Sequence, residues 1–358
     1  MWPRPSPTPL EADPTTAAAA TAEPATAEPA TAEPVTAGTA VADTIAAAPR
    51  RTGTGPGLRG PAWKRRVTVG LFLAPALTIY VLLTLVPIVQ GAFYSTWDWN
   101  GLEPLENFVG LQNYRDALAD PVFLGALRHV AVIAVLSLVL QLPFALGLAV
   151  LLHQRIRGRA AFRLLFFLPF VLGDVTVAIV WKLLLQPAGM ADGTLDALGL
   201  EGLSQLWLAD TNVVLYTVFV VVSWKYFGFH MILCLAGLQG IPVELEEAAA
   251  LDGASRAQAF RYVTLPLLAP TLRVSVFLSI IGSLQLFDLV WVLTGGGPVG
   301  ASHTTGTYML QYGFDRKQLG YGSAVAVIGF AVSFVVALAY QRFVLRRDVA
   351  GALTAVGA

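Results

Sequence analysis

The most constraining feature of this 358-residue sequence is a long stretch without charge: from Val67 to Trp97 it has no acidic or basic side chain. A helix that crosses the hydrocarbon core of a bilayer needs about 20 mostly apolar residues, so this stretch is long enough to span a membrane. Charged residues make up 13% of the chain, against about 25% in soluble domains. The chain has too little polar surface for water, and lipid is its expected solvent.

Five further long and mostly apolar stretches follow. The predicted spans cover residues 67–91, 127–152, 164–185, 213–238, 270–293 and 322–344. Lysine and arginine concentrate before the first span, in every second loop and after the sixth, a pattern that favours the cytoplasmic side for these segments. The sequence therefore predicts an all-α, polytopic membrane protein with six transmembrane helices and both termini in the cytoplasm.

Residues 1–60 are rich in Ala, Thr, Pro and Glu, and a Thr-Ala-Glu-Pro unit repeats there. A segment with so few large apolar residues cannot offset the entropy lost on ordering, so we expect a disordered cytoplasmic tail. Its composition favours a tether or filler over a binding segment. The predicted organisation is this tail, a transmembrane domain over 65–345 and a short cytoplasmic tail over 346–358.

The loop between the fourth and fifth spans reads as two short helices with a break between them. Pro242 suits a helix start, and glutamates in the first turns favour the positive helix end. Gly253 can end this first helix in the left-handed conformation. We expect the second helix to run from about Ser255 to Val263, and we expect Pro266 to stop it. Small side chains in the loop let another protein approach closely.

The spacing in this loop resembles the cytoplasmic motif of permease subunits in binding-protein-dependent ABC importers. The motif runs Glu-Ala-Ala, two residues, Asp-Gly-Ala, five residues, Phe, two residues, an aliphatic residue, one residue, Leu-Pro. The chain matches it at Glu247, Ala248, Ala249, Asp252, Gly253, Ala254, Phe260, Val263, Leu265 and Pro266. The resemblance covers about residues 65–345.

Other stretches resemble the carbohydrate-uptake branch, in particular the larger maltose permease subunit and the glycerol-phosphate permease. They are 108–111, 113–114, Arg159, 162–163, 167–169, 181–182, 235–239, 241–242, 287–288, 293–298 and 320–324. A disaccharide, an oligosaccharide, a monosaccharide, a polyol and a glycerol phosphate all remain open as solutes.

The resemblance implies a MetI-like fold in the bacterial plasma membrane. It also implies a second permease subunit, two ATPase subunits and an extracytoplasmic solute-binding protein as partners. ATP and Mg²⁺ would bind to the ATPase subunits, and this chain would bind no cofactor. In that family the loop forms a coupling helix that docks on the ATPase, rather than an ordinary amphipathic loop helix. Glu247 would form an ion pair there, Ala248, Ala249 and Gly253 would allow close packing, and Asp252 would cap or orient the break.

Several classes of function lack their motifs in this sequence. No Gly-Lys dipeptide occurs, and the phosphate-binding loop of ATPases requires one. The four histidines are scattered, so neither a metal site nor a haem pair is expected. A formal net charge of zero gives no basic surface for nucleic acid. We therefore expect a transporter subunit without enzymatic activity of its own.

Three ionisable residues, Asp174, Lys225 and Asp288, fall deep inside predicted spans. A charge at the bilayer centre costs about 2.5–3.5 kcal/mol and usually faces a partner or a cavity. We predict that Lys225 pairs with Asp174 or Asp288. The group could line the solute path, but a structural ion pair is the simpler interpretation.

The fourth span is, by resemblance, the candidate for the solute path. Ser223, Trp224, Tyr226 and His230 lie on it, and Asp288 lies on the fifth span. Hydroxyl, aromatic and polar groups of this kind suit sugar rings and their hydroxyls. Trp224 and Tyr226 could instead be packing or interfacial aromatic residues.

Two other classes of membrane protein fit less well. A secondary transporter driven by an ion gradient would show repeat symmetry between its halves and interrupted helices near the midplane, and the sequence has no convincing internal repeat. The membrane anchor of an oxidoreductase would need paired histidines for haem, which the sequence lacks.

Overall fold

The computed structural model describes residues 62–154 and 156–345. In these ranges the secondary structure is helical, apart from one isolated bridge between Trp97 and Phe108. The chain divides into two units, residues 1–69 and 70–358, and the first helix begins in the former. The two predicted tails lie outside the described residues, so their disorder stays a prediction.

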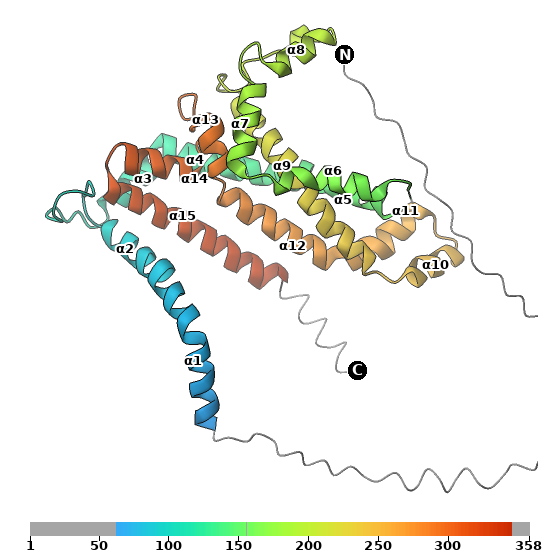
Figure 1. Cartoon of the computed structure of the whole chain (residues 1–358), viewed down its shortest axis with the longest axis horizontal. Helices are drawn as coiled ribbons and strands as arrows, with labels where there is room; N and C mark the ends of the chain where they lie inside the picture. Colours follow the sequence, from blue (N-terminus) through green and yellow to red (C-terminus); the bar gives the residue numbers. More distant parts are fainter. Residues whose placement is uncertain (1–61, 155, 346–358) are drawn as a thin grey trace, which may run out of the picture. The chain divides into compact units, whose positions relative to one another are not determined.

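The described part of the chain is a series of helices, two of which, α12 and α15, lie side by side (Figure 1). They are α1 (Ala62–Tyr80), α2 (Val86–Tyr94), α3 (Gln112–Ala119), α4 (Pro121–Leu136), α5 (Leu142–His153), α6 (Arg159–Val171), α7 (Asp174–Leu184), α8 (Met190–Ala197), α9 (Val214–Gln239), α10 (Val243–Leu251), α11 (Arg256–Ala259), α12 (Leu265–Leu284), α13 (Asp288–Thr294), α14 (Thr305–Met309) and α15 (Leu319–Tyr340).

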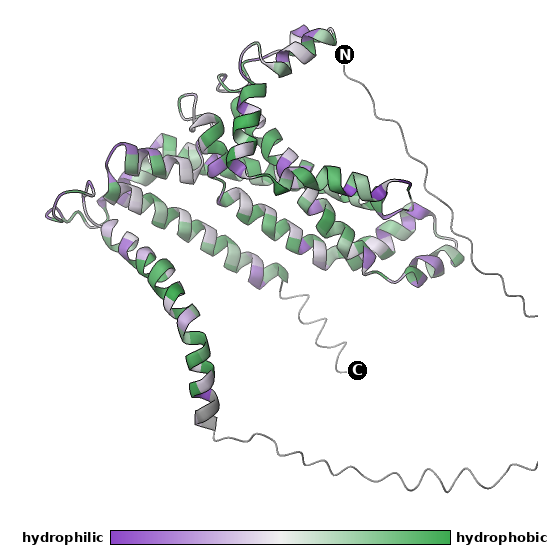
Figure 2. Cartoon of the chain, in the orientation of Figure 1, coloured by the Kyte–Doolittle hydropathy of each residue, from purple (hydrophilic) through white to green (hydrophobic). Residues whose placement is uncertain are grey.

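Five continuous helical stretches in the described ranges are long and apolar enough to cross a membrane, and a bent pair of helices supplies a sixth. The five are Arg66–Tyr94, Pro121–His153, Val214–Gln239, Arg256–Leu284 and Leu319–Leu345. Hydrophobic residues cover most of α12 and α15 (Figure 2). The predicted class, a helical membrane protein with about six spans, is confirmed, although two of the predicted spans differ in form.

The third predicted span is two helices rather than one. α6 and α7 meet at 97°, because Leu172 and Gly173 between them have extended backbone, with ψ of 141° and 146°. The Leu172 carbonyl, freed at the end of α6, accepts a hydrogen bond from Lys225 Nζ. Average hydropathy registers apolar residues but not a turn between them, so the sequence predicted one straight helix.

The fifth predicted span is shifted. A continuous helix runs over Arg256–Leu284, and α13 begins at Asp288 after a break at 285–287. The expectation that Pro266 stops a helix is therefore wrong. The helix continues because a π-helical turn over Phe260–Thr264 comes just before the proline.

Three prolines in the candidate spans share this arrangement. A π-helical turn ends two residues before each of them: Val81–Leu85 before Pro87, Ser137–Gln141 before Pro143, and Phe260–Thr264 before Pro266. A proline ring collides with the carbonyl four residues earlier in a regular α-helix. The wider π turn moves the hydrogen-bond pattern by one residue, and the helix can pass the proline without ending.

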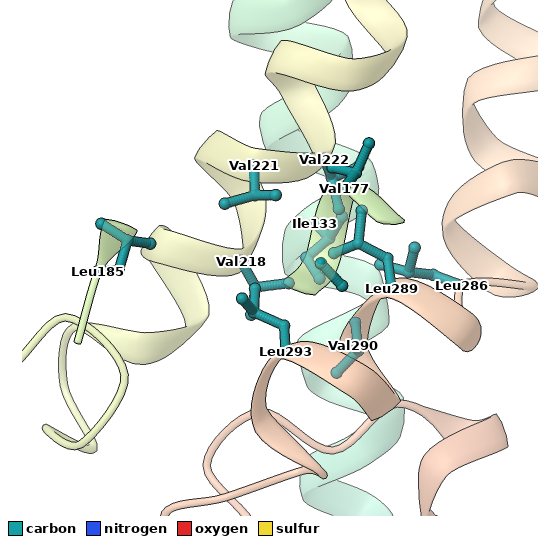
Figure 3. Packing of buried hydrophobic residues seen from close by; sticks show 11 residues of the cluster. Ile133, Val177, Leu185, Val218, Val221, Val222, Leu286, Leu289, Val290 and Leu293 are labelled. Carbon is teal, nitrogen blue, oxygen red and sulfur yellow. The ribbon is translucent and has the colours of Figure 1, made fainter. Parts of the chain in front are cut away.

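α9 is the central helix of the unit that follows residue 69. Its most apolar window is 61% buried, whereas the other continuous spans range from 0% to 33%. One hydrophobic cluster packs Val218 and Val222 of α9 against Leu289 and Leu293 of α13 (Figure 3). A second cluster joins α9 to α5 and α12. α9 can thus hold side chains away from lipid. A polar group at such a buried position needs a hydrogen-bond or ion-pair partner.

The loop after α2 is fastened to α3 by Asn113, whose Nδ2 donates to the carbonyls of Ser95 and Trp97, each over 2.9 Å. Ser95 Oγ also lies 2.6 Å from Tyr114 Oη. Residues 108–114, which carry part of the family resemblance, therefore have a structural role. The Asn113 side-chain amide satisfies two backbone carbonyls where the chain leaves α2.

Candidate functional site

A cavity of about 330 Å³ lies between α9, α12 and the breaks that follow α6 and α12. We call it the central pocket. Its polar lining residues are Ser137, Gln141, Asp174, Tyr226, His230, Ser279, Ser283, Gln285 and Asp288. A larger cavity of about 520 Å³ beside α7, α8 and α9 has an almost wholly apolar lining. The central pocket is therefore the better candidate for a hydroxylated solute.

Three serines form a polar stripe on α12. Ser275, Ser279 and Ser283 are all buried, and residues four apart share one face of a helix. Ser283 Oγ donates to the Ser279 carbonyl over 2.9 Å, and Ser275 Oγ lies 2.7 Å from Nδ1 of His230 on α9. The stripe thus faces α9, and two of its members reach the central pocket.

Lys225 fastens α9 to the bend between α6 and α7. Its side chain is 4% exposed, and its Nζ lies 3.3 Å from Asp174 Oδ1 and donates to the Leu172 carbonyl. Tyr226 Oη also donates to Asp174 Oδ1, over 3.0 Å. Of the two pairings that the sequence left open, the structure has the one with Asp174.

The two acids lie at helix starts rather than in the interior of a continuous helix. Asp174 is the first residue of α7, and Asp288 is the first residue of α13. Carboxylates are favourable at this end of a helix because the helix dipole is positive there. Asp288 is exposed on the central pocket and makes no hydrogen bond or ion pair with any described residue.

The structure separates the residues that the sequence proposed for the solute path. Tyr226, His230 and Asp288 line the central pocket, whereas Ser223 and Trp224 do not. The Trp224 ring packs edge-on against Trp181, with 5.5 Å between ring centroids. For Trp224, the structure therefore has the packing arrangement that the sequence left as an alternative.

Sequence reasoning missed most of the other pocket residues. The serine stripe had a signal, because polar residues at 275, 279 and 283 recur every fourth position in an apolar run. Gln141 and Gln285 are isolated amides in apolar surroundings and could have been noted for that reason. Phe170 had no such signal, because only the bend after α6 brings it to the pocket.

Replacing Lys225 with methionine is expected to lower the free energy of unfolding by about 2 kcal/mol, because the Asp174 carboxylate loses its counter-charge. The value is modest since the Asp174 side chain is 32% exposed. The double variant Lys225→Met, Asp174→Asn should recover part of the loss. Thermal unfolding of the detergent-solubilised chain measures both, and equal stability of the single and double variants would contradict a coupled pair.

The first part of the motif, residues 247–254, lies in α10 and the turn that ends it, and the second part, residues 260–266, lies in the continuous helix Arg256–Leu284. Gly253 has φ of +85°, which confirms the expected left-handed helix end. The Ala254 N–H donates to the Ala249 carbonyl over 3.0 Å, and the Gly253 N–H donates to the Ala250 carbonyl over 3.1 Å. These two bonds define a Schellman motif. The Asp252 side chain makes no hydrogen bond with described residues, so its expected capping role stays a prediction.

α10 is tied to the long helix that carries the serine stripe. Glu246 Oε1 accepts a hydrogen bond from Thr264 Oγ1 over 2.8 Å, and Thr264 lies in the continuous helix Arg256–Leu284. The next residue, Glu247, is exposed, as are Ala248 and the 89%-exposed Leu251. α10 therefore has one attached side and one open side of mixed acidic and apolar character.

The chain matches the family model "Binding-protein-dependent transport system inner membrane component" over residues 141–349, a range that includes α9, α10 and α12. A probable ABC transporter permease of Pyrococcus horikoshii is 36% identical over 75% of this chain and 93% of that protein. The diacetylchitobiose uptake system permease of Streptomyces coelicolor is 33% identical over 76% of this chain and 81% of that protein.

Solved structures agree on the fold. A chain from a bacterial ABC transporter involved in the import of the acidic polysaccharide alginate superposes with a TM-score of 0.69. The two chains are 22% identical, and the alignment covers 79% of this chain and 96% of that one. The family match over more than half of the sequence and the relatives of 33–36% identity show that the chain belongs to the binding-protein-dependent transport system inner membrane components, the permease subunits of ABC importers.

Proposed function

We propose that this chain is one of two permease subunits of an ATP-driven importer for a sugar or related solute, and that the central pocket is its part of the solute path. The observation that carries the proposal is the pocket itself, where hydroxyl, amide and aromatic groups gather between helices able to span a membrane. Such groups suit sugars. Relatives named for multiple-sugar and starch-product transport support a carbohydrate.

The partners follow from the same proposal. Two ATPase subunits would bind ATP and Mg²⁺, and this chain would bind no cofactor. The open side of α10, with Glu247 and Ala248, would dock on one of them, with Phe260, Leu265 and Pro266 forming the helix behind it. An extracytoplasmic binding protein would deliver the solute, which is supported by a solved relative in complex with a periplasmic protein that holds alginate pentasaccharide.

The helix behind α10 suggests how the movement would reach the solute. ATP binding would close the ATPase pair and displace α10. The bond between Glu246 and Thr264 would pass the displacement to the helix Arg256–Leu284, whose far end carries Ser279 and Ser283. Rocking of this helix would open the pocket to the other side of the bacterial plasma membrane. The distribution of basic residues supports cytoplasmic termini.

An ion-driven secondary transporter is the alternative. The breaks after α6 and α12 are of the kind such transporters use near the midplane. That function would leave the open side of α10 without a role. Membership of the importer family favours ATP as the energy source for transport.

Replacing Gly282 with leucine is expected to reduce solute uptake at least about tenfold, which corresponds to roughly 1.4 kcal/mol. Gly282 lines the pocket, and a Cβ added there meets no atom within 4 Å. The new side chain would therefore fill the cavity without disturbing the helix. Uptake of radiolabelled diacetylchitobiose and maltose into ATP-loaded, right-side-out vesicles that contain the whole importer provides the measurement.

Gly147→Leu is the matched control, because Gly147 also has open space around it but lies outside the pocket. It should leave uptake near the wild-type rate. Uptake that does not depend on ATP, and that a proton or sodium ionophore abolishes, would favour the secondary transporter. Normal uptake by Gly282→Leu would remove the central pocket from the solute path.

A further inference from the structure

Among the described residues of this chain, the charged groups around the central pocket do not balance, and this limits the solutes that it can hold. We infer that the pocket accepts sugars that are uncharged or carry a positive group, and that it excludes sugars with a carboxylate or phosphate. The inference rests on the proposed function, because it applies only if the solute passes through this pocket. It removes glycerol phosphate from the solutes that the sequence left open.

Two carboxylates line the pocket, whereas no lysine or arginine of the described ranges does. Lys225 lies behind the wall, and its ammonium group already contacts the Asp174 carboxylate and the Leu172 carbonyl. One of the two negative charges is therefore matched. The charge of Asp288 is left over, since its carboxylate has no hydrogen-bond or ion-pair partner in the part of the chain that the structure describes.

The helix ends at the pocket offer no alternative site for an anion. Helix N-termini commonly attract phosphates and carboxylates, and two helices begin at this wall. α7 begins with Asp174 and α13 begins with Asp288. At each of these ends a carboxylate of the chain already takes the favourable position, and an anionic solute would meet a like charge there.

The remaining groups suit uncharged hydroxyls. Gln141, Gln285 and Ser279 line the pocket, and each can donate and accept hydrogen bonds. The Asp288 carboxylate can accept from two hydroxyls of one sugar ring, and it would attract an ammonium group. Like charges a few ångströms apart in a partly dry cavity repel strongly enough to weaken the binding of an anion more than about tenfold.

The test uses the assembled importer, this chain with its membrane and ATPase partners, in lipid nanodiscs. The binding protein is omitted so that its own selectivity does not enter. Three disaccharide probes differ in charge: maltose is neutral, chitobiose carries ammonium groups, and digalacturonate carries carboxylates. Saturation-transfer difference NMR measures their dissociation constants. We expect maltose and chitobiose to bind, and digalacturonate to bind at least about tenfold more weakly.

Asp288→Asn removes the unmatched charge with little change of shape. It should reduce the ratio of the dissociation constants of digalacturonate and maltose about tenfold. It should also weaken the binding of chitobiose. Asp196→Asn is the matched control, because Asp196 is an exposed aspartate of α8 outside the pocket, and it should leave all ratios unchanged. Equal binding of digalacturonate and maltose to the wild type would overturn the inference, as would an equal effect of Asp288→Asn on all three probes.

Gly282→Leu separates this inference from the proposed function. If only the inference is wrong, Gly282→Leu still abolishes binding of every probe, while the wild type shows no preference for charge. If the proposed function is wrong, either no probe binds or Gly282→Leu changes neither binding nor uptake. In both of those cases the inference falls as well.

Discussion

Replacing Gly228 with alanine is expected to destabilise the folded chain by about 3 kcal/mol and to reduce its accumulation in the membrane. A Cβ at Gly228 of α9 would lie 1.9 Å from the carbonyl oxygen of Phe166 on α6. The obstructing atom belongs to the backbone, so no side-chain rotation can relieve the clash. Close approach through a small residue is a common basis of helix packing in membranes, and this one holds the first half of the bent pair against the central helix.

Gly147→Ala provides the control for this prediction. Gly147 is also in a helix, α5, but nothing lies within 4 Å of an added Cβ. Alanine favours a helix over glycine by about 1 kcal/mol, so this variant should be neutral or slightly stabilised. Fluorescence-detected size-exclusion chromatography after heating measures both variants. Equal melting temperatures would mean that α6 can move away from α9 at little cost.

The two glycines also show what the sequence could not predict. Both stand in apolar runs, and nothing in their neighbours distinguishes a residue against a backbone from one in open space. The bend at Leu172 and Gly173 had the same difficulty, because its carbonyl is satisfied by Lys225, 53 positions away in the sequence. Features that depend on such distant partners become visible only when the helices are placed together.

Features with local causes were predicted well. The left-handed end of α10 follows from Gly253, because glycine adopts this conformation without a steric penalty. The approximate positions of the candidate spans follow from apolar length. Part of the central pocket could also have been predicted, since Ser279 and Ser283 repeat at the helical period. Asp288 was named as a candidate from its charge, but its place at the start of a helix was not predicted, because hydropathy averaged over the predicted span does not register the break between α12 and α13.

Replacing Glu247 with arginine is expected to remove the ATPase subunits from the purified complex and to stop ATP-dependent uptake, while the second permease is retained. Glu247 is exposed on α10 and makes no hydrogen bond with described residues, so the folded chain should be as stable as the wild type. Reversal of a charge at a docking surface weakens binding when the partner has the opposite charge. Affinity purification from gently solubilised native membranes, followed by mass spectrometry, identifies what remains bound.

Glu103→Arg makes the same change of charge in the loop after α2, at another exposed position, and should leave the ATPase bound. Retention of the ATPase by Glu247→Arg would show that α10 does not dock through this carboxylate. Recovery of the wild-type chain alone, under conditions that preserve known complexes, would instead favour the ion-driven transporter. Loss of the ATPase with Glu247→Arg and its retention with Glu103→Arg would show that the open side of α10 docks on the ATPase. The bond between Glu246 and Thr264 would then be the next contact to test on the way to the solute.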